Sequence, residues 1–192
     1  DLKQFTFDLG LGKIAMGLKG SLVGGNLTAT LTAPVINSAD LPMALPLTKP
    51  IQIKDFHATV KAHYPLPPGG SAEQLVDIHD LGFAVAMGQS LLTVQGYGTG
   101  GRLTIMVSAP SISTADLPTE LSLKKPIEMQ ALQLSAELKG QDLRVNNLSL
   151  QLFGGTIKAI GGVTAGSLAP PLNGKVTVAG LQLGPALDAL GP

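Results

Sequence analysis

One stretch of this sequence occurs twice, at a spacing of 76 residues. Residues 38–51 read SADLPMALPLTKPI, and residues 114–127 read TADLPTELSLKKPI. When the comparison is extended upstream, 27–51 and 103–127 share 14 identities in 25 positions. A long repeat of this kind indicates a chain built from copies of one structural unit, each of which packs on its neighbour.

The strongest local pattern is the alternation of apolar and polar residues. Leu27, Ala29, Leu31 and Ala33 alternate with threonines, which places an apolar row on one face of a β-strand. The same alternation recurs in further segments, namely 83–87, 92–94, 103–107, 132–138 and 148–152. Because the 192 residues include 24 Gly and 14 Pro, short strands joined by turns are favoured over long helices.

The sequence therefore predicts an all-β fold. We expect a repeated antiparallel meander that forms an elongated, curved, groove-like sheet with one or two short helices, near 72–75 and 185–190. Three related repeat units, 1–62, 72–138 and 142–190, are expected to form one continuous sheet domain.

The repeated ADLP sequence predicts a turn. The side chain of Asp40 or Asp116 can accept a hydrogen bond from a nearby backbone N–H, and the proline that follows removes a donor from the sheet. The KPI sequence at the end of each copy then starts the next strand. We interpret both aspartates as structural rather than as a catalytic pair.

No pattern of reactive residues predicts an enzyme, a metal site or a cofactor. His57, His63 and His79 do not have the spacing of metal-ligand motifs, and the chain contains no Cys. The glycine run 96–101 lacks the GK[ST] ending of a phosphate-binding loop and leads into a strand, so it predicts a hairpin. Since 13 basic residues balance 13 acidic ones, the chain has no basic footprint for nucleic acid.

The apolar face of the sheet is the candidate functional surface. Small and aliphatic side chains would line a groove that holds acyl chains while the lipid headgroups stay in water. The predicted lining residues are Leu31, Ile53, Val85, Val94, Ile105, Leu134 and Leu150. Two hypotheses follow. Either these residues bind lipid, or the chain is a structural β-repeat segment of a cell-surface or envelope assembly protein whose second sheet covers them and whose strand edges bind proteins.

The C-terminal unit resembles the AsmA family of bacterial envelope proteins. The shared features are a double-glycine hairpin at 153–155, a small-residue strand at 156–164, paired prolines at 170–171 and the segment LQLGPALDAL at 181–190. The two ADLP segments are similar to the region that precedes this part in the same family, so the resemblance covers essentially the whole chain.

This resemblance implies a periplasmic, β-rich body anchored in the inner membrane by an N-terminal helix that is missing from this sequence. AsmA-like proteins are similar to chorein-type bridge proteins, whose long curved sheet carries phospholipids. The chain is accordingly identified as a central fragment of a protein that takes part in phospholipid transport towards the outer membrane, with envelope proteins as possible partners. The cargo is implied by the family and not by the spacing of the residues.

Overall fold

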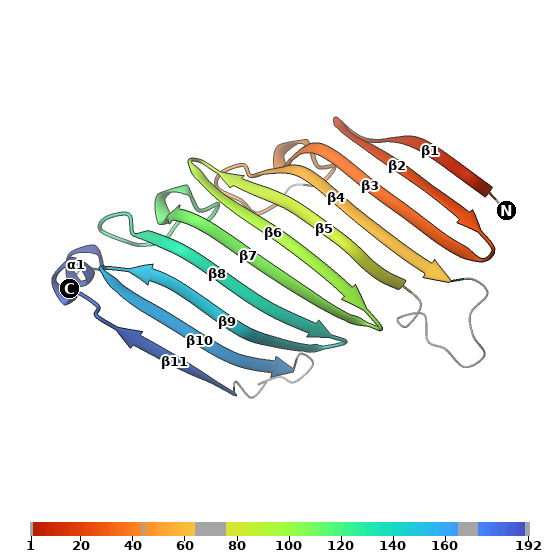
Figure 1. The fold of residues 1–192 in the computed structure, drawn as a ribbon. Coiled ribbons are helices and arrows are strands. Elements are labelled where there is room, and N and C mark those ends of the chain that lie inside the picture. Colours follow the sequence, from red (N-terminus) through yellow and green to blue (C-terminus); the bar gives the residue numbers. More distant parts are fainter. Residues whose placement is uncertain (1, 44, 64–75, 165–172, 191–192) are drawn as a thin grey trace.

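The chain folds into one open antiparallel sheet (Figure 1). The computed structural model describes residues 2–43, 45–63, 76–164 and 173–190. Within these residues, 11 strands lie in sequence order, and each strand pairs with its neighbours in the sequence. The sheet does not close, because β1 and β11 form its two edges. The predicted all-β, elongated, curved meander is confirmed, whereas the helix predicted near 72–75 lies outside the described residues.

The strands contain between 7 and 12 residues each. They are β1 (Leu2–Leu11), β2 (Ile14–Val23), β3 (Asn26–Asn37), β4 (Gln52–His63), β5 (Val76–Met87), β6 (Ser90–Thr99), β7 (Arg102–Ser113), β8 (Glu128–Lys139), β9 (Asp142–Leu152), β10 (Gly155–Thr164) and β11 (Asn173–Ala179). The helix α1 (Leu183–Leu190) follows β11 and contains the segment expected to be helical at 185–190. No helix in the described part of the chain is both long enough and apolar enough to cross a membrane.

The 76-residue spacing of the sequence is also the spacing of the structure. Strands β2, β3 and β4 begin and end 76 residues before β6, β7 and β8. The hairpins after β2 and β6 turn at Gly24–Gly25 and Gly100–Gly101, and all four glycines have positive φ, as two-residue hairpin turns require. The glycine run 96–101 therefore forms a hairpin, as its sequence predicts. The boundaries of the three predicted units stay a prediction.

Each ADLP segment leaves the sheet after one strand and returns to start the next. In segment 38–51, the N–H of Ser38 donates to the carbonyl of Ile51, and the N–H of Ile51 donates to the hydroxyl of Ser38. Thr114 and Ile127 make the same two bonds in segment 114–127. Each segment is thus closed at its base by a reciprocal pair of hydrogen bonds.

The repeated aspartates link these segments to a neighbouring hairpin, and Asp40 also accepts a hydrogen bond from the side-chain amide of Asn37 at 2.9 Å. A carboxylate oxygen of Asp116 accepts from the N–H of Gln89 at 3.2 Å and from the hydroxyl of Ser90 at 2.8 Å. In the first unit, Asp40 lies 3.8 Å from the ammonium group of Lys13, the residue 76 positions before Gln89. Three of these four contacts are long-range, whereas the sequence predicts a hydrogen bond from a nearby backbone N–H.

Both ADLP-flanking strands β4 and β8 contain a bulge at the same position of the repeat. Asp55 and Ala131 have φ of 54° and 49°, which is rare for residues other than glycine. In β4 the pairing register with β5 shifts between Lys54 and His57, so one extra residue is inserted there. Because of the extra residue, Ile53 lies on the same face of the sheet as Ala58, although the two are an odd number of positions apart.

Candidate functional site

All seven predicted lining residues lie on one face of the sheet, which we call the apolar face. Residues directly opposite each other in an antiparallel pair share a face, so the register traces this face from strand to strand. Leu31 is opposite Leu18 and Ala58, and Ile53 is opposite Val85.

The register continues the apolar face across the middle strands and into the C-terminal ones. Val94 is opposite Val107, which in turn is opposite Leu134. Ile105 lies between Gly96 and Ala136, and Leu150 is opposite Ile157. All seven lining residues are half-buried, so none is enclosed in a core. The structure thus brings the predicted residues together on a single surface.

The apolar face carries no charge along the described strands. At the paired positions of this face there is no Asp, Glu, Lys, Arg or His, and Ser90 is the one hydroxyl-bearing residue. Charged residues such as Lys19, Lys61 and Glu137 lie at paired positions of the opposite face. The sheet is therefore strongly two-sided over its whole width.

The apolar face is covered at one end of the strands only. Figure 1 shows both ADLP segments and α1 at the same end of the sheet. The strand residues of the apolar face that are buried there are Ile14, Ala33, Met87, Ser90, Ala109 and Ile112. Within the described ranges, no large side chain is below 2% exposed, and those ranges contain no second sheet. Away from this end, Ala136 is also buried, at 8% exposure, but no second layer of the described chain lies over the apolar face.

A hollow of about 360 Å³ lies on the apolar face near the C-terminal edge. It is lined by apolar-face side chains of β9, β10 and β11, including Leu143, Leu148 and Val176. Gly161 and Gly174 face each other across β10 and β11, so backbone rather than side chain forms the floor. The sequence pattern did not indicate this uncharged hollow, although its glycines are visible in the sequence.

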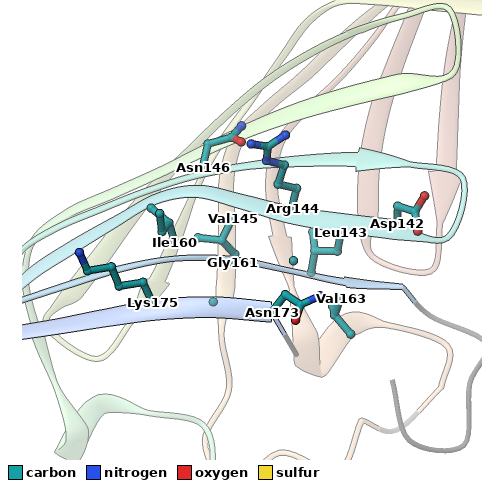
Figure 2. Close-up of a pocket in the computed structure, with 12 residues that line it drawn as sticks. Asp142, Leu143, Arg144, Val145, Asn146, Ile160, Gly161, Val163, Asn173 and Lys175 are labelled. Atoms are coloured by element: carbon teal, nitrogen blue, oxygen red, sulfur yellow. The ribbon is translucent and has the colours of Figure 1, made fainter. Parts of the chain in front are cut away.

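A larger recess of about 620 Å³ is formed at the same strand ends (Figure 2). In the close-up, Arg144 and Asn146 project from β9 to one side of the sheet, whereas Leu143 projects to the other. Lys175 of β11 also lines this recess. Polar and cationic groups are thus present beside the apolar hollow but are separated from it by the sheet.

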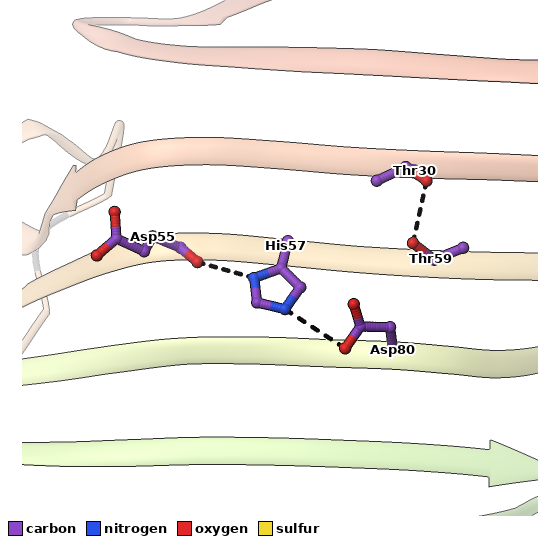
Figure 3. A network of polar contacts seen from close by, with 5 residues as sticks. All are labelled: Thr30, Asp55, His57, Thr59 and Asp80. Atoms are coloured by element: carbon purple, nitrogen blue, oxygen red, sulfur yellow. Dashed lines mark hydrogen bonds and ion pairs between the residues drawn. The ribbon is translucent and has the colours of Figure 1, made fainter.

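The polar face carries a small network centred on His57 (Figure 3). Its Nδ1 lies 3.1 Å from the carbonyl oxygen of Asp55, and its Nε2 lies 3.4 Å from a carboxylate oxygen of Asp80. Nearby, the hydroxyls of Thr30 and Thr59 are 3.0 Å apart. No nucleophile joins His57 and Asp80 in these contacts, and the described residues contain no group of three metal-ligating side chains. The network links β3, β4 and β5 across their polar face.

Two hydrogen bonds alter the acidity of the Asp77 carboxyl group on this face. Hydrogen bonds from the Thr99 side chain and the Gly100 N–H stabilise its charged form and lower its pKa. The carboxylate therefore joins β5 to the turn between β6 and β7.

Comparison with protein-family models, with curated proteins and with solved structures gave no match for this chain. The functional argument consequently depends on the geometry of the sheet and on the sequence resemblance described above.

Proposed function

We propose that this chain is a lipid-handling module that holds acyl chains on its apolar face. In this proposal it is part of an AsmA-like periplasmic protein that is anchored to the inner membrane and bridges phospholipid transport towards the outer membrane. The observation that carries the proposal is the uncharged, uncovered face that continues across 11 strands. Leu31, Ile53, Val85, Val94, Ile105, Leu134 and Leu150 act as lining and not as catalysts.

The energetics favour an apolar occupant for such a face. Burial stabilises by about 0.8 kcal/mol per CH₂, so an acyl chain of about 16 carbons would gain on the order of 12 kcal/mol relative to water. Soluble monomers rarely leave contiguous apolar areas of this kind open to solvent. A uniform aliphatic surface also provides no strong single site, so a bound chain can move along it.

The apolar face is long enough for an acyl chain to move along it, rather than being confined to one pocket. With neighbouring strands about 4.8 Å apart, the 11 strands span roughly 48 Å from edge to edge. Small residues such as Ala and Gly lie beside Leu, Ile and Val on this face. The Ile105 side chain, for example, stands between Gly96 and Ala136.

The competing hypothesis is a structural β-repeat segment without lipid cargo. It requires another layer to cover the apolar face, which the described residues do not supply. Native mass spectrometry of the purified protein, followed by organic extraction, separates the two hypotheses. Bound phospholipid in defined stoichiometry is expected for the lipid-handling module, and a stable protein with an empty face is expected for the structural segment.

The matched variants for this experiment are Ile105→Asp and Met106→Asp. Ile105 lies on the apolar face, whereas its neighbour Met106 lies on the opposite face, opposite Gln95 and Ser135, and is 40% exposed. We expect Ile105→Asp to abolish co-purified phospholipid and Met106→Asp to retain it, while both proteins keep their far-UV circular dichroism. Equal lipid loss in the two variants, or none in either, would contradict the proposal.

A further inference from the structure

The junction between the first two repeat units is built from two contacts. The first is the pairing of β4 with β5 in the sheet. The second joins the ADLP segments: the N–H of Thr48 donates to the carbonyl of Pro118 at 2.9 Å, and the ammonium group of Lys49 donates to the carbonyl of Ala115. Strand β4 and segment 38–51, which precedes it, therefore both contact the second repeat unit.

The same junction recurs 76 residues later. Strand β8 pairs with β9, and the N–H of Lys124, the counterpart of Thr48, donates to the carbonyl of Ala189 in α1 at 3.1 Å. Lys125, the counterpart of Lys49, lies 3.8 Å from the carboxylate of Asp188. Two independent examples thus define how one unit receives another.

The outer side of the first unit has the receiving surface without a neighbour in the described chain. Strand β1 is at the edge of the sheet, and its Phe7 is 53% exposed, while the equivalent Phe83 of β5 is half-buried. Leu11 is 43% exposed, whereas its counterpart Met87 is 8% exposed. In segment 38–51, Pro42 is exposed, although the equivalent Pro118 is half-buried beneath Thr48.

We propose that the β1 edge, together with the Ala39 and Pro42 side of segment 38–51, is a docking site for another repeat unit of the same kind. The occupant is an extended segment with the pattern of β4 and the ADLP segment before it, added antiparallel to β1 by β-augmentation. The β4–β5 register, moved back by 76 residues, places the counterpart of Ile53 opposite Leu9 and that of Ala58 opposite Phe5.

This pairing also explains why β1 carries the exposed apolar residues Phe7 and Leu11 at its edge position. The phenyl rings of Phe56 and Phe83 lie 6.0 Å apart across the existing junction, so the counterpart of Phe56 would contact Phe7. We expect the docked segment to bury Leu11, whose counterpart Met87 is 8% exposed. The inference does not depend on lipid binding, because it uses only contacts between protein segments.

A synthetic peptide with the sequence of residues 38–63 tests the proposal. The peptide is labelled with a fluorophore, and its binding to the purified protein is followed by fluorescence anisotropy. Hydrogen–deuterium exchange on the same mixture locates the contact, and we expect new protection in β1. A peptide with Asp in place of both Ile53 and Phe56 should bind at least tenfold more weakly.

The matched protein variants are Phe7→Asp on β1 and Val178→Asp on β11, since both side chains are 53% exposed on the apolar face at opposite edges. We expect Phe7→Asp to lower the affinity of the protein for the peptide at least tenfold. Val178→Asp should leave this affinity unchanged. The exchange experiment on the unsubstituted protein decides the matter if Phe7→Asp fails to fold. Absence of binding, protection confined to β11, or a β1-mediated dimer that the peptide does not dissociate would overturn the proposal.

Discussion

The openness of the apolar face can be measured by comparing Leu134→Ala with Leu134→Asp. Leu134 is half-buried between Val107 and Leu148 in neighbouring strands. Truncation to Ala removes three side-chain carbons, which are worth about 0.8 kcal/mol each when wholly buried, so a half-buried site should lose about 1.2 kcal/mol. Because both variants remove nearly the same apolar contacts, the difference between them reports the cost of placing a carboxylate on this face.

On an open face the carboxylate stays hydrated. The Asp variant should then be less stable than the Ala variant only by the lower strand propensity of Asp, which is up to about 1 kcal/mol. In a closed core an unpaired carboxylate would cost several kcal/mol more. A domain of this size has about 5–15 kcal/mol of stability, so the Asp variant is expected to remain folded.

Urea unfolding followed by far-UV circular dichroism is the suitable assay, since the chain has no Trp and only 2 Tyr. The free energies of unfolding of the original protein and the two variants are compared under the same conditions. A difference between the Asp and Ala variants of more than about 3 kcal/mol, or an unfolded Asp variant, would refute the argument that the face is open.

Two further substitutions test the elements that shape this face. Asp116→Ala removes the acceptor for the Gln89 N–H and for the buried Ser90 hydroxyl. The free energy of unfolding in urea should fall by about 1–3 kcal/mol, and the amount of co-purified lipid should not change. Loss of lipid without loss of stability would contradict a structural role for Asp116. Ala131→Gly should raise the thermal midpoint by relieving a left-handed conformation worth about 1 kcal/mol, and Ala131→Val should lower it; the reverse order would contradict the bulge.

The two-sided sheet could be predicted from the sequence because its signal is local. Alternation with a period of two fixes which side chains share a face within each strand, and the 76-residue repeat carries that choice from one unit to the next. Six of the seven predicted lining residues lie in segments whose alternation indicates this face, whereas Ile53 lies beyond the bulge at Asp55. The glycine pairs that turn the hairpins are equally local, since only residues that tolerate positive φ suit those positions.

The contacts of the aspartates could not be predicted in this way. Asp116 accepts hydrogen bonds from a hairpin 26 and 27 residues away in the sequence, and only the folded sheet brings that hairpin beside the segment. The bulges did leave a signal that simple alternation overlooks. The apolar residues Ile53 and Phe56 are three positions apart, as are Met129 and Leu132, where an unbroken strand would have two or four.

These bulges decide how the apolar face ends. Without the extra residue at Ala131, Met129 would turn to the charged side; with it, Met129 lies opposite Ile112, which is 5% exposed beneath the ADLP segment. The apolar surface therefore runs without interruption from the uncovered part of the sheet to the end that the segments close. In the proposed lipid-handling role, an acyl chain would enter from the uncovered side and stop at the closed end, so movement over longer distances would proceed across the strands, from one repeat unit to the next.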